Sequence, residues 1–224
     1  MFPISDDAPR STTPYVNYLL IILNILVFIF EVSLVPRDEA TFVACMVGNL
    51  HAAKDHLTLL RAWQLVVDRL EPLGKKPVLL LAGRLDSMAD RVKALAFDLR
   101  LHDSVQFLGL VEDIAGLLEA VDLGVFCSPK ESCPNGVLEC MAVGLPVVAS
   151  DIAGVREVVG ESGLAHLAPP EDAVTLAERI VGLAMNPALC ESLSKINRER
   201  IATHYSIERM GESMTKIIAD ALTR

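Results

Sequence analysis

Beyond Pro36, apolar residues fall into short continuous runs, and the stretches between these runs show helical periodicity. Strands that are covered on both faces are apolar throughout, whereas half-exposed strands alternate with polar residues. The runs therefore predict parallel strands at residues 42–47, 78–82, 105–108, 123–127 and 146–149, with a weaker one at 165–168.

In the intervening stretches, apolar residues recur at three- and four-residue steps, as on one face of a helix. Leu59, Trp63, Val66 and Leu70 follow this spacing in the first stretch, and Pro72 comes next as a stop signal. Helices are predicted at residues 55–70, 86–101, 114–121, 136–143, 171–185, 188–204 and 207–222. This alternation predicts the α/β class, with a single Rossmann-like doubly wound parallel sheet and a helical C-terminal layer.

The first 35 residues have a different pattern. Residues 16–35 are nearly all apolar and are interrupted by Asn17, Asn24, Glu31 and Ser33. About 20 apolar residues are needed to cross a bilayer as a helix. We therefore expect an N-terminal hydrophobic helix that spans a membrane, with a helix buried in a soluble core as the alternative. The expected domains are residues 1–35 and residues 36–224.

The N-terminal segment resembles a membrane protease family. The stretch MFPISDDAPRSTTPYVNYLLIILNILVFIFE is similar to the cytoplasmic start and first membrane helix of rhomboid intramembrane proteases. That family has a serine in a GxSG motif on a membrane helix, and residues 160–163 match the motif as GESG. Charged residues surround the match, so we interpret it as a polar turn and exclude protease activity.

Composition and charge narrow the function classes. Hydrophobic residues make up 52% of the chain, which excludes a disordered protein. The net charge is −9 and no basic run is present, so no nucleic acid is expected as a partner. None of the five cysteines forms a CxxC pair, which predicts reduced, mostly buried thiols in a cytoplasmic protein. No metal site and no cofactor are expected.

The first candidate site loop follows the strand at residues 42–47. Gly48 lets the backbone turn and approach a ligand closely. Lys54 follows near the start of the next helix, where its ammonium could meet a diphosphate. The alternative is a solvated lysine in the first turn of that helix.

The second candidate loop, residues 128–139, follows the strand at residues 123–127. Asn135 is a good N-cap for a helix that starts near Gly136, and the free N–H groups of a helix start form an anion site. Glu131 precedes this start and Glu139 lies one turn into the helix, so both could accept hydrogen bonds from sugar hydroxyls. In the alternative, Glu131 is a surface carboxylate and Glu139 offsets the helix dipole.

These loops resemble the donor-binding C-terminal domain of family 4 retaining glycosyltransferases, which have the two-domain GT-B architecture. The similarity covers roughly residues 36–222. Its most specific part is a Glu-x7-Glu motif with a small-residue helix and an apolar strand, which reads Glu131-SCPNGVL-Glu139-CMAVGLPVVASDIAG. The strand–loop–lysine element of the family appears as VGNLHAAK, ending at Lys54.

The resemblance implies a role for each site residue. Glu139 would bind the donor ribose, Glu131 would hold hydroxyls of the transferred sugar, and Lys54 would stabilise the leaving diphosphate. The backbone near Val111 would recognise the base. The remaining donor-binding residues implied are Gly48, Asn49, Asn135, Gly136, Val137 and Leu138. Family members often have arginine in place of Asn49.

The expected function is binding of a UDP- or GDP-sugar for retaining glycosyl transfer to an unknown acceptor, a sugar or a lipid. The acceptor-binding domain of the family has no counterpart here, so we expect the chain alone to transfer little. A non-catalytic nucleotide-sugar-binding or scaffold module and a fragment of a sugar-nucleotide 2-epimerase remain alternatives. The expected location is cytoplasmic, with residues 16–35 as a membrane anchor. A rhomboid-like helix would place the domain across the membrane, which favours a fusion artefact or a peripheral association.

Overall fold

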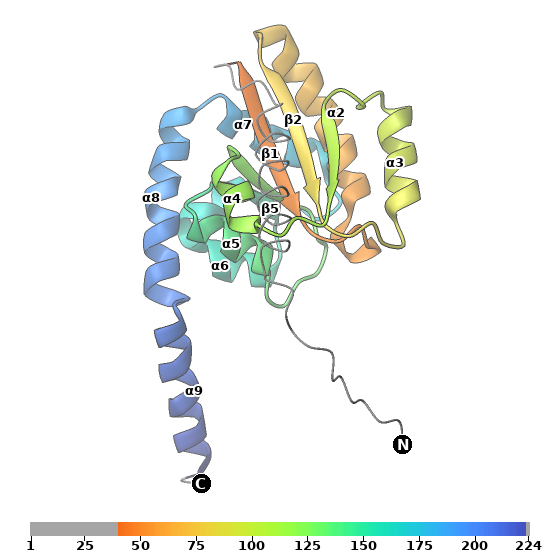
Figure 1. The fold of residues 1–224 in the computed structure, drawn as a ribbon. Coiled ribbons are helices and arrows are strands. Elements are labelled where there is room, and N and C mark those ends of the chain that lie inside the picture. The colour runs from red at the N-terminus through yellow and green to blue at the C-terminus, as the bar shows by residue number, and fades with distance from the viewer. Residues whose placement is uncertain (1–39, 223–224) are drawn as a thin grey trace, which may run out of the picture. The chain divides into compact units, whose positions relative to one another are not determined.

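Six parallel strands form the central sheet of residues 40–222, the part of the chain that the computed structural model describes (Figure 1). Their order is β3-β2-β1-β4-β5-β6. The bounds are β1 Thr41–Val47, β2 Lys76–Ala82, β3 Val105–Gly109, β4 Leu123–Phe126, β5 Val147–Ser150 and β6 Leu167–Ala168. All six predicted strands and the Rossmann-like class are confirmed. The predicted helix at residues 16–35 and the predicted domain boundary lie outside the described residues.

The order of the strands creates a switch point between β1 and β4. The chain moves from β1 through β2 to β3 on one side, then returns to place β4 on the other side of β1. In a sheet of this kind, the loops on the two sides of the switch point diverge and leave a crevice at the carboxyl ends of the strands. The topology therefore places a ligand site there.

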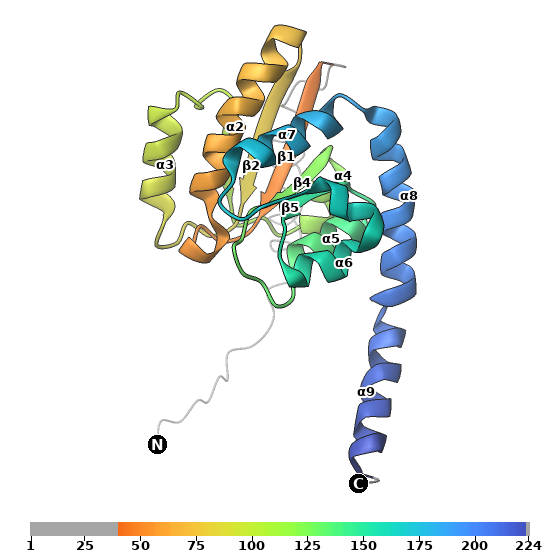
Figure 2. The same ribbon diagram turned by 180° about the vertical axis from the view of Figure 1, so that it is seen from behind.

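Helices cover both faces of the sheet. Residues of β1 divide between the faces: Phe42, Ala44 and Met46 pack into the larger core, and Val43 and Cys45 point the other way. On that side of the sheet, α2, α3 and α7 pack against the strands and supply most of the helical part of the larger core (Figure 2). The α-helices are α2 His56–Leu70, α3 Ala89–Asp98, α4 Ile114–Glu119, α5 Asn135–Ala142, α6 Ala153–Gly163, α7 Ala173–Ala184, α8 Pro187–His204 and α9 Ile207–Leu222.

Short 3-10 turns complete the described part: η1 Ala52–Lys54, η2 Glu71–Leu73 and η3 Leu164–His166. The seven predicted helices are present, although the second is shorter than predicted. All five cysteines are free: Cys45, Cys127 and Cys140 are buried, and Cys133 is exposed. The prediction of unpaired, mostly buried thiols is confirmed.

The helix α6 corrects the interpretation of residues 160–163 as a polar turn. These residues form the end of α6, with a local break at Gly160, where φ is 64°. Val155, Val158 and Val159 are buried at the spacing of a helix face. Flanking glycines and charged residues obscured this short apolar stripe in the sequence.

The C-terminal helix α9 carries an exposed apolar stripe. Ile207, Met210, Met214, Ile218 and Leu222 are all more than half exposed. Within residues 40–222, no single helix has the length and hydropathy to cross a bilayer; α7 taken with its bent continuation to Leu222 reaches both.

Candidate functional site

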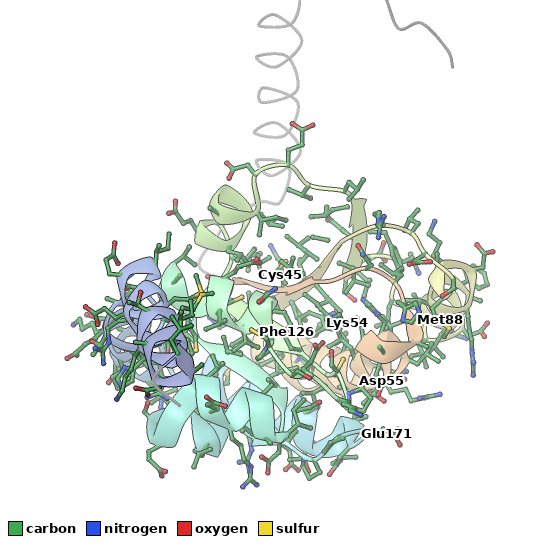
Figure 3. All side chains as sticks on the ribbon, turned by 90° about the horizontal axis from the view of Figure 1, so that it is seen from below. Cys45, Lys54, Asp55, Met88, Phe126 and Glu171 are labelled. Atoms are coloured by element: carbon green, nitrogen blue, oxygen red, sulfur yellow. The ribbon has the colours of Figure 1, made fainter. Side chains whose placement is uncertain are left out.

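A cavity of about 480 Å³ opens at the carboxyl ends of the strands. Figure 3 looks onto this end of the sheet, with Lys54 and Phe126 labelled. The cavity is lined by residues at the ends of β1 to β5 and in the loops that follow these strands. The cavity therefore occupies the switch point at which the topology places a ligand site.

Most of the residues selected from the sequence line this one cavity. They are Gly48, Asn49, Lys54, Val111, Glu131, Asn135, Gly136, Val137 and Glu139. Leu138 is not part of the lining. The two acidic residues and the lysine thus meet at one crevice, as the spacing of the motifs predicted.

Lys54 is carried by a rigid turn. It ends η1, and the next residue, Asp55, has left-handed backbone angles (φ 48°). The Asp55 carboxylate accepts a hydrogen bond from the N–H of Thr58 at 3.3 Å and so caps α2. The buried thiol of Cys127, at the end of β4, donates to the Asp55 carbonyl oxygen at 3.1 Å. These contacts tie Lys54 to the sheet.

Lys54 and Glu131 form an ion pair across the cavity, between Nζ and Oε1. Their side chains are 34% and 20% exposed. The loop carrying Glu131 lies against α6, because a Cβ at Gly154 would come within 2.6 Å of the Glu131 carbonyl oxygen. Neither residue is a simple solvated surface charge.

The start of α5 differs from the prediction. The N-cap is Pro134, and Asn135 is the first helical residue, so the assignment of Asn135 as N-cap is wrong. The N–H groups of Val137 and Leu138 already bond the Pro134 carbonyl oxygen, at 3.0 and 3.1 Å. The proline fixes its own φ and therefore starts the helix one residue early.

One amide at the α5 start stays available. The Asn135 N–H bonds the Cys133 carbonyl oxygen at 3.0 Å, whereas the Gly136 N–H has no acceptor within residues 40–222. A Cβ at Gly136 would lie 2.4 Å from the Phe126 ring, so only glycine fits this packing. The Gly136 N–H and the helix dipole can meet an anion in the cavity.

Beyond the charged end, the cavity wall is apolar. Leu110, Val111, Ile114 and Val155 contribute to it. The backbone N–H and C=O of Val111 make no hydrogen bond within the described part of the chain, so both can face a planar ring edge. Desolvation at the wall raises the pKa of Glu139, one turn into α5.

Some lining residues were not selected from the sequence. Gly83, at the end of β2, has φ 156°, and a Cβ there would lie 2.3 Å from the Gly48 carbonyl oxygen. Its position after the apolar run of β2 was the available signal. Ser128, Cys133 and Ser150 also line the cavity.

The chain matches a known protein family over most of its length. The family model described as Glycosyl transferases group 1 matches residues 41–186. The phosphatidyl-myo-inositol mannosyltransferase of Mycobacterium leprae is 35% identical over 116 residues, which are 50% of this chain and 30% of that protein. The D-inositol 3-phosphate glycosyltransferase of Saccharomonospora viridis is 28% identical over 194 residues, which are 84% of this chain and 44% of that protein.

A solved structure shares the fold. Anabaena HepE, in complex with UDP and glucose, superposes with a TM-score of 0.71 at 21% identity, over 81% of this chain and 49% of that chain. This chain spans less than half the length of each of these three proteins. The shared part is the Rossmann-like sheet with its flanking helices.

Proposed function

Because this chain belongs to the group 1 glycosyl transferases, we propose that residues 40–222 bind a nucleotide diphosphate sugar at the switch point for retaining transfer of the sugar. One observation carries the proposal. Lys54, Glu131 and Glu139 line a single cavity together with the free N–H of Gly136. Together these groups can recognise each chemical part of such a donor.

The donor extends from the apolar wall to the charged end of the cavity. The base lies against the free backbone groups of Val111, and Glu139 accepts hydrogen bonds from the ribose. The diphosphate lies between Lys54 and the Gly136 N–H. Glu131 accepts hydrogen bonds from the sugar hydroxyls, each contributing about 1.5–3 kcal/mol. UDP is the first nucleotide to test, since the HepE structure contains UDP.

The cavity favours departure of the diphosphate. When the bond between the anomeric carbon and the diphosphate oxygen breaks, negative charge builds up on that oxygen. The Lys54 ammonium stabilises this charge where it develops, as fixed donors do in other transfer reactions. The acceptor hydroxyl attacks from the same face as the leaving group and passes its proton to the departing diphosphate oxygen, so the anomeric configuration is retained.

The acceptor site lies outside residues 40–222 in this proposal. Donor recognition accounts for the charged residues that line the cavity, so none of these is left to activate an acceptor hydroxyl. We propose that a second, acceptor-binding domain or chain closes over the cavity. Donor binding can therefore be tested separately from transfer.

Titration calorimetry of the full chain with UDP and with GDP tests the proposal. We expect one of them to bind, and binding to be lost in Lys54→Ala and in Glu139→Ala. Heat from neither nucleotide would overturn the proposal. A scaffold module, by contrast, would keep its partner after both substitutions. Retention is checked by NMR of the anomeric proton of the product, once an acceptor that supports transfer is found.

A further inference from the structure

The charged side chains that line the donor cavity cannot neutralise the negative charge of a diphosphate. The ionisable lysine and glutamate residues that line it are Lys54, Glu131 and Glu139, which gives a formal charge of 1 − 2 = −1. Lys54 is also already paired with Glu131. A bound diphosphate adds about two further negative charges, and like charges in one cleft repel. One more cation close to the cavity is needed.

Arg84 is placed to supply this cation. It follows Gly83, which lines the cavity, and it is exposed. Its guanidinium forms no ion pair or hydrogen bond with any residue in the range 40–222. Arg84 is not itself among the residues that line the cavity, but a guanidinium next in sequence to the cavity wall and without a carboxylate partner is free to turn toward an anion.

The backbone of Arg84 is fixed at two points, one of which lies on the cavity wall. Its N–H donates to the Asn49 Oδ1 at 3.0 Å, and its carbonyl oxygen accepts from the Leu50 N–H at 3.0 Å. Asn49 itself lines the cavity. Thus the Asn49 amide, which cannot act as a cation, instead fixes the backbone of an arginine in the loop after the neighbouring strand.

Lys130 is the competing cation. It is exposed, precedes Glu131, and forms no ion pair within the described residues. No hydrogen bond in that part of the chain ties its backbone to the cavity wall. A guanidinium also matches two phosphate oxygens at once, whereas an ammonium acts as a point charge.

We infer that Arg84 is a donor-binding residue that contacts the diphosphate, with Asn49 as the positioning residue that holds it there. The inference rests on the proposed function and extends it. The arginine follows β2 and Lys54 follows β1, so each would contribute its own part of the affinity for the diphosphate.

A series of ligands tests the inference. The full chain, Arg84→Gln, Arg84→Lys and the control Lys130→Gln are titrated with uridine, UMP and UDP by calorimetry, and with GDP as well. We expect Arg84→Gln to weaken binding of the preferred diphosphate by about tenfold or more, because a charge-assisted pair is lost. Uridine should bind as before, Arg84→Lys should recover part of the loss, and Lys130→Gln should bind like the unaltered chain.

Asn49→Ala gives a second readout. It should weaken diphosphate binding in the unaltered chain but not in the Arg84→Gln background, because Asn49 acts through the arginine. Equal diphosphate affinity in Arg84→Gln and the unaltered chain overturns the inference while the proposed function stands. A loss of uridine binding in Arg84→Gln also overturns it, since the change would then act through the fold. No nucleotide binding by the unaltered chain overturns both.

Discussion

Removing Glu131 should change the affinities for UDP and for UDP-glucose in opposite directions. Without ligand, Glu131 is paired with Lys54, so UDP must compete with Glu131 for the lysine. The pair is partly exposed, at 34% and 20% for the two side chains, and such pairs contribute about 1 kcal/mol. In Glu131→Ala the lysine is free, and UDP should bind about fivefold more tightly.

The same substitution should lower the affinity for UDP-glucose. The loss of one hydrogen bond from a sugar hydroxyl to the carboxylate costs about 1.5–3 kcal/mol. The freed lysine offsets about 1 kcal/mol of this loss, so the net affinity should fall by about twofold to thirtyfold. The ratio of the two dissociation constants should thus shift by about 10- to 150-fold.

Calorimetry with both ligands measures the two effects on one protein sample. Glu191→Ala is the matched control, because Glu191 forms an exposed pair with Lys195 on α8, far along the chain from the cavity loops. That variant should bind both ligands unchanged. If Glu131→Ala weakens UDP as much as UDP-glucose, Glu131 does not restrain Lys54, and the assignment of the sugar to this carboxylate fails.

Three further predictions concern single positions. Gly136→Ala places a methyl group 2.4 Å from the Phe126 ring, so we expect a loss of about 1–3 kcal/mol in stability and weaker UDP binding, measured by urea unfolding and calorimetry. Gly83→Ala meets the Gly48 backbone at 2.3 Å and should lower the melting temperature and abolish UDP binding, whereas an unchanged melting curve would contradict the packing. Burial lowers the pKa of His56 to about 4. Between about pH 6.5 and pH 4, this histidine is therefore protonated in the unfolded chain but neutral in the folded chain. Stability should therefore fall as the pH drops through this window, by about 2 kcal/mol more between pH 7.5 and 5 in the unaltered chain than in His56→Leu, as urea unfolding at each pH would show.

The sheet was predictable because its strands are buried on both faces. A run such as Val147–Ser150 is apolar at nearly every position, and a half-exposed helix does not give that pattern. By contrast, the helix Ala153–Gly163 was missed because its buried side is only three valines wide and glycines lie between charged residues around it. Local pattern predicts an element well only when the element buries enough apolar residues to override its turn-forming ones.

The sequence predicted which residues line the site, but not which of them form an ion pair. Lys54 and Glu131 each follow a strand end, and parallel strand ends meet at one edge of a sheet, so their convergence follows from strand order. Their ion pair depends on rotamers of residues 77 positions apart, which no local pattern encodes. The helix start was misplaced by one residue, because Pro134 competes with Asn135 for the same cap.

The main chain and the side chains determine different properties of this cavity. Its shape is set by close backbone contacts, such as that of Gly83 with Gly48, which leave no room for a Cβ. Its charge is set by exposed or half-exposed side chains that contribute little to the core, since Lys54 and Glu131 both remain partly open to solvent. Substitutions of the charged residues should therefore change ligand affinity at nearly constant stability, whereas substitutions of the glycines should lower both together. The affinity and stability changes of a set of variants, measured side by side, will separate the two kinds of residue.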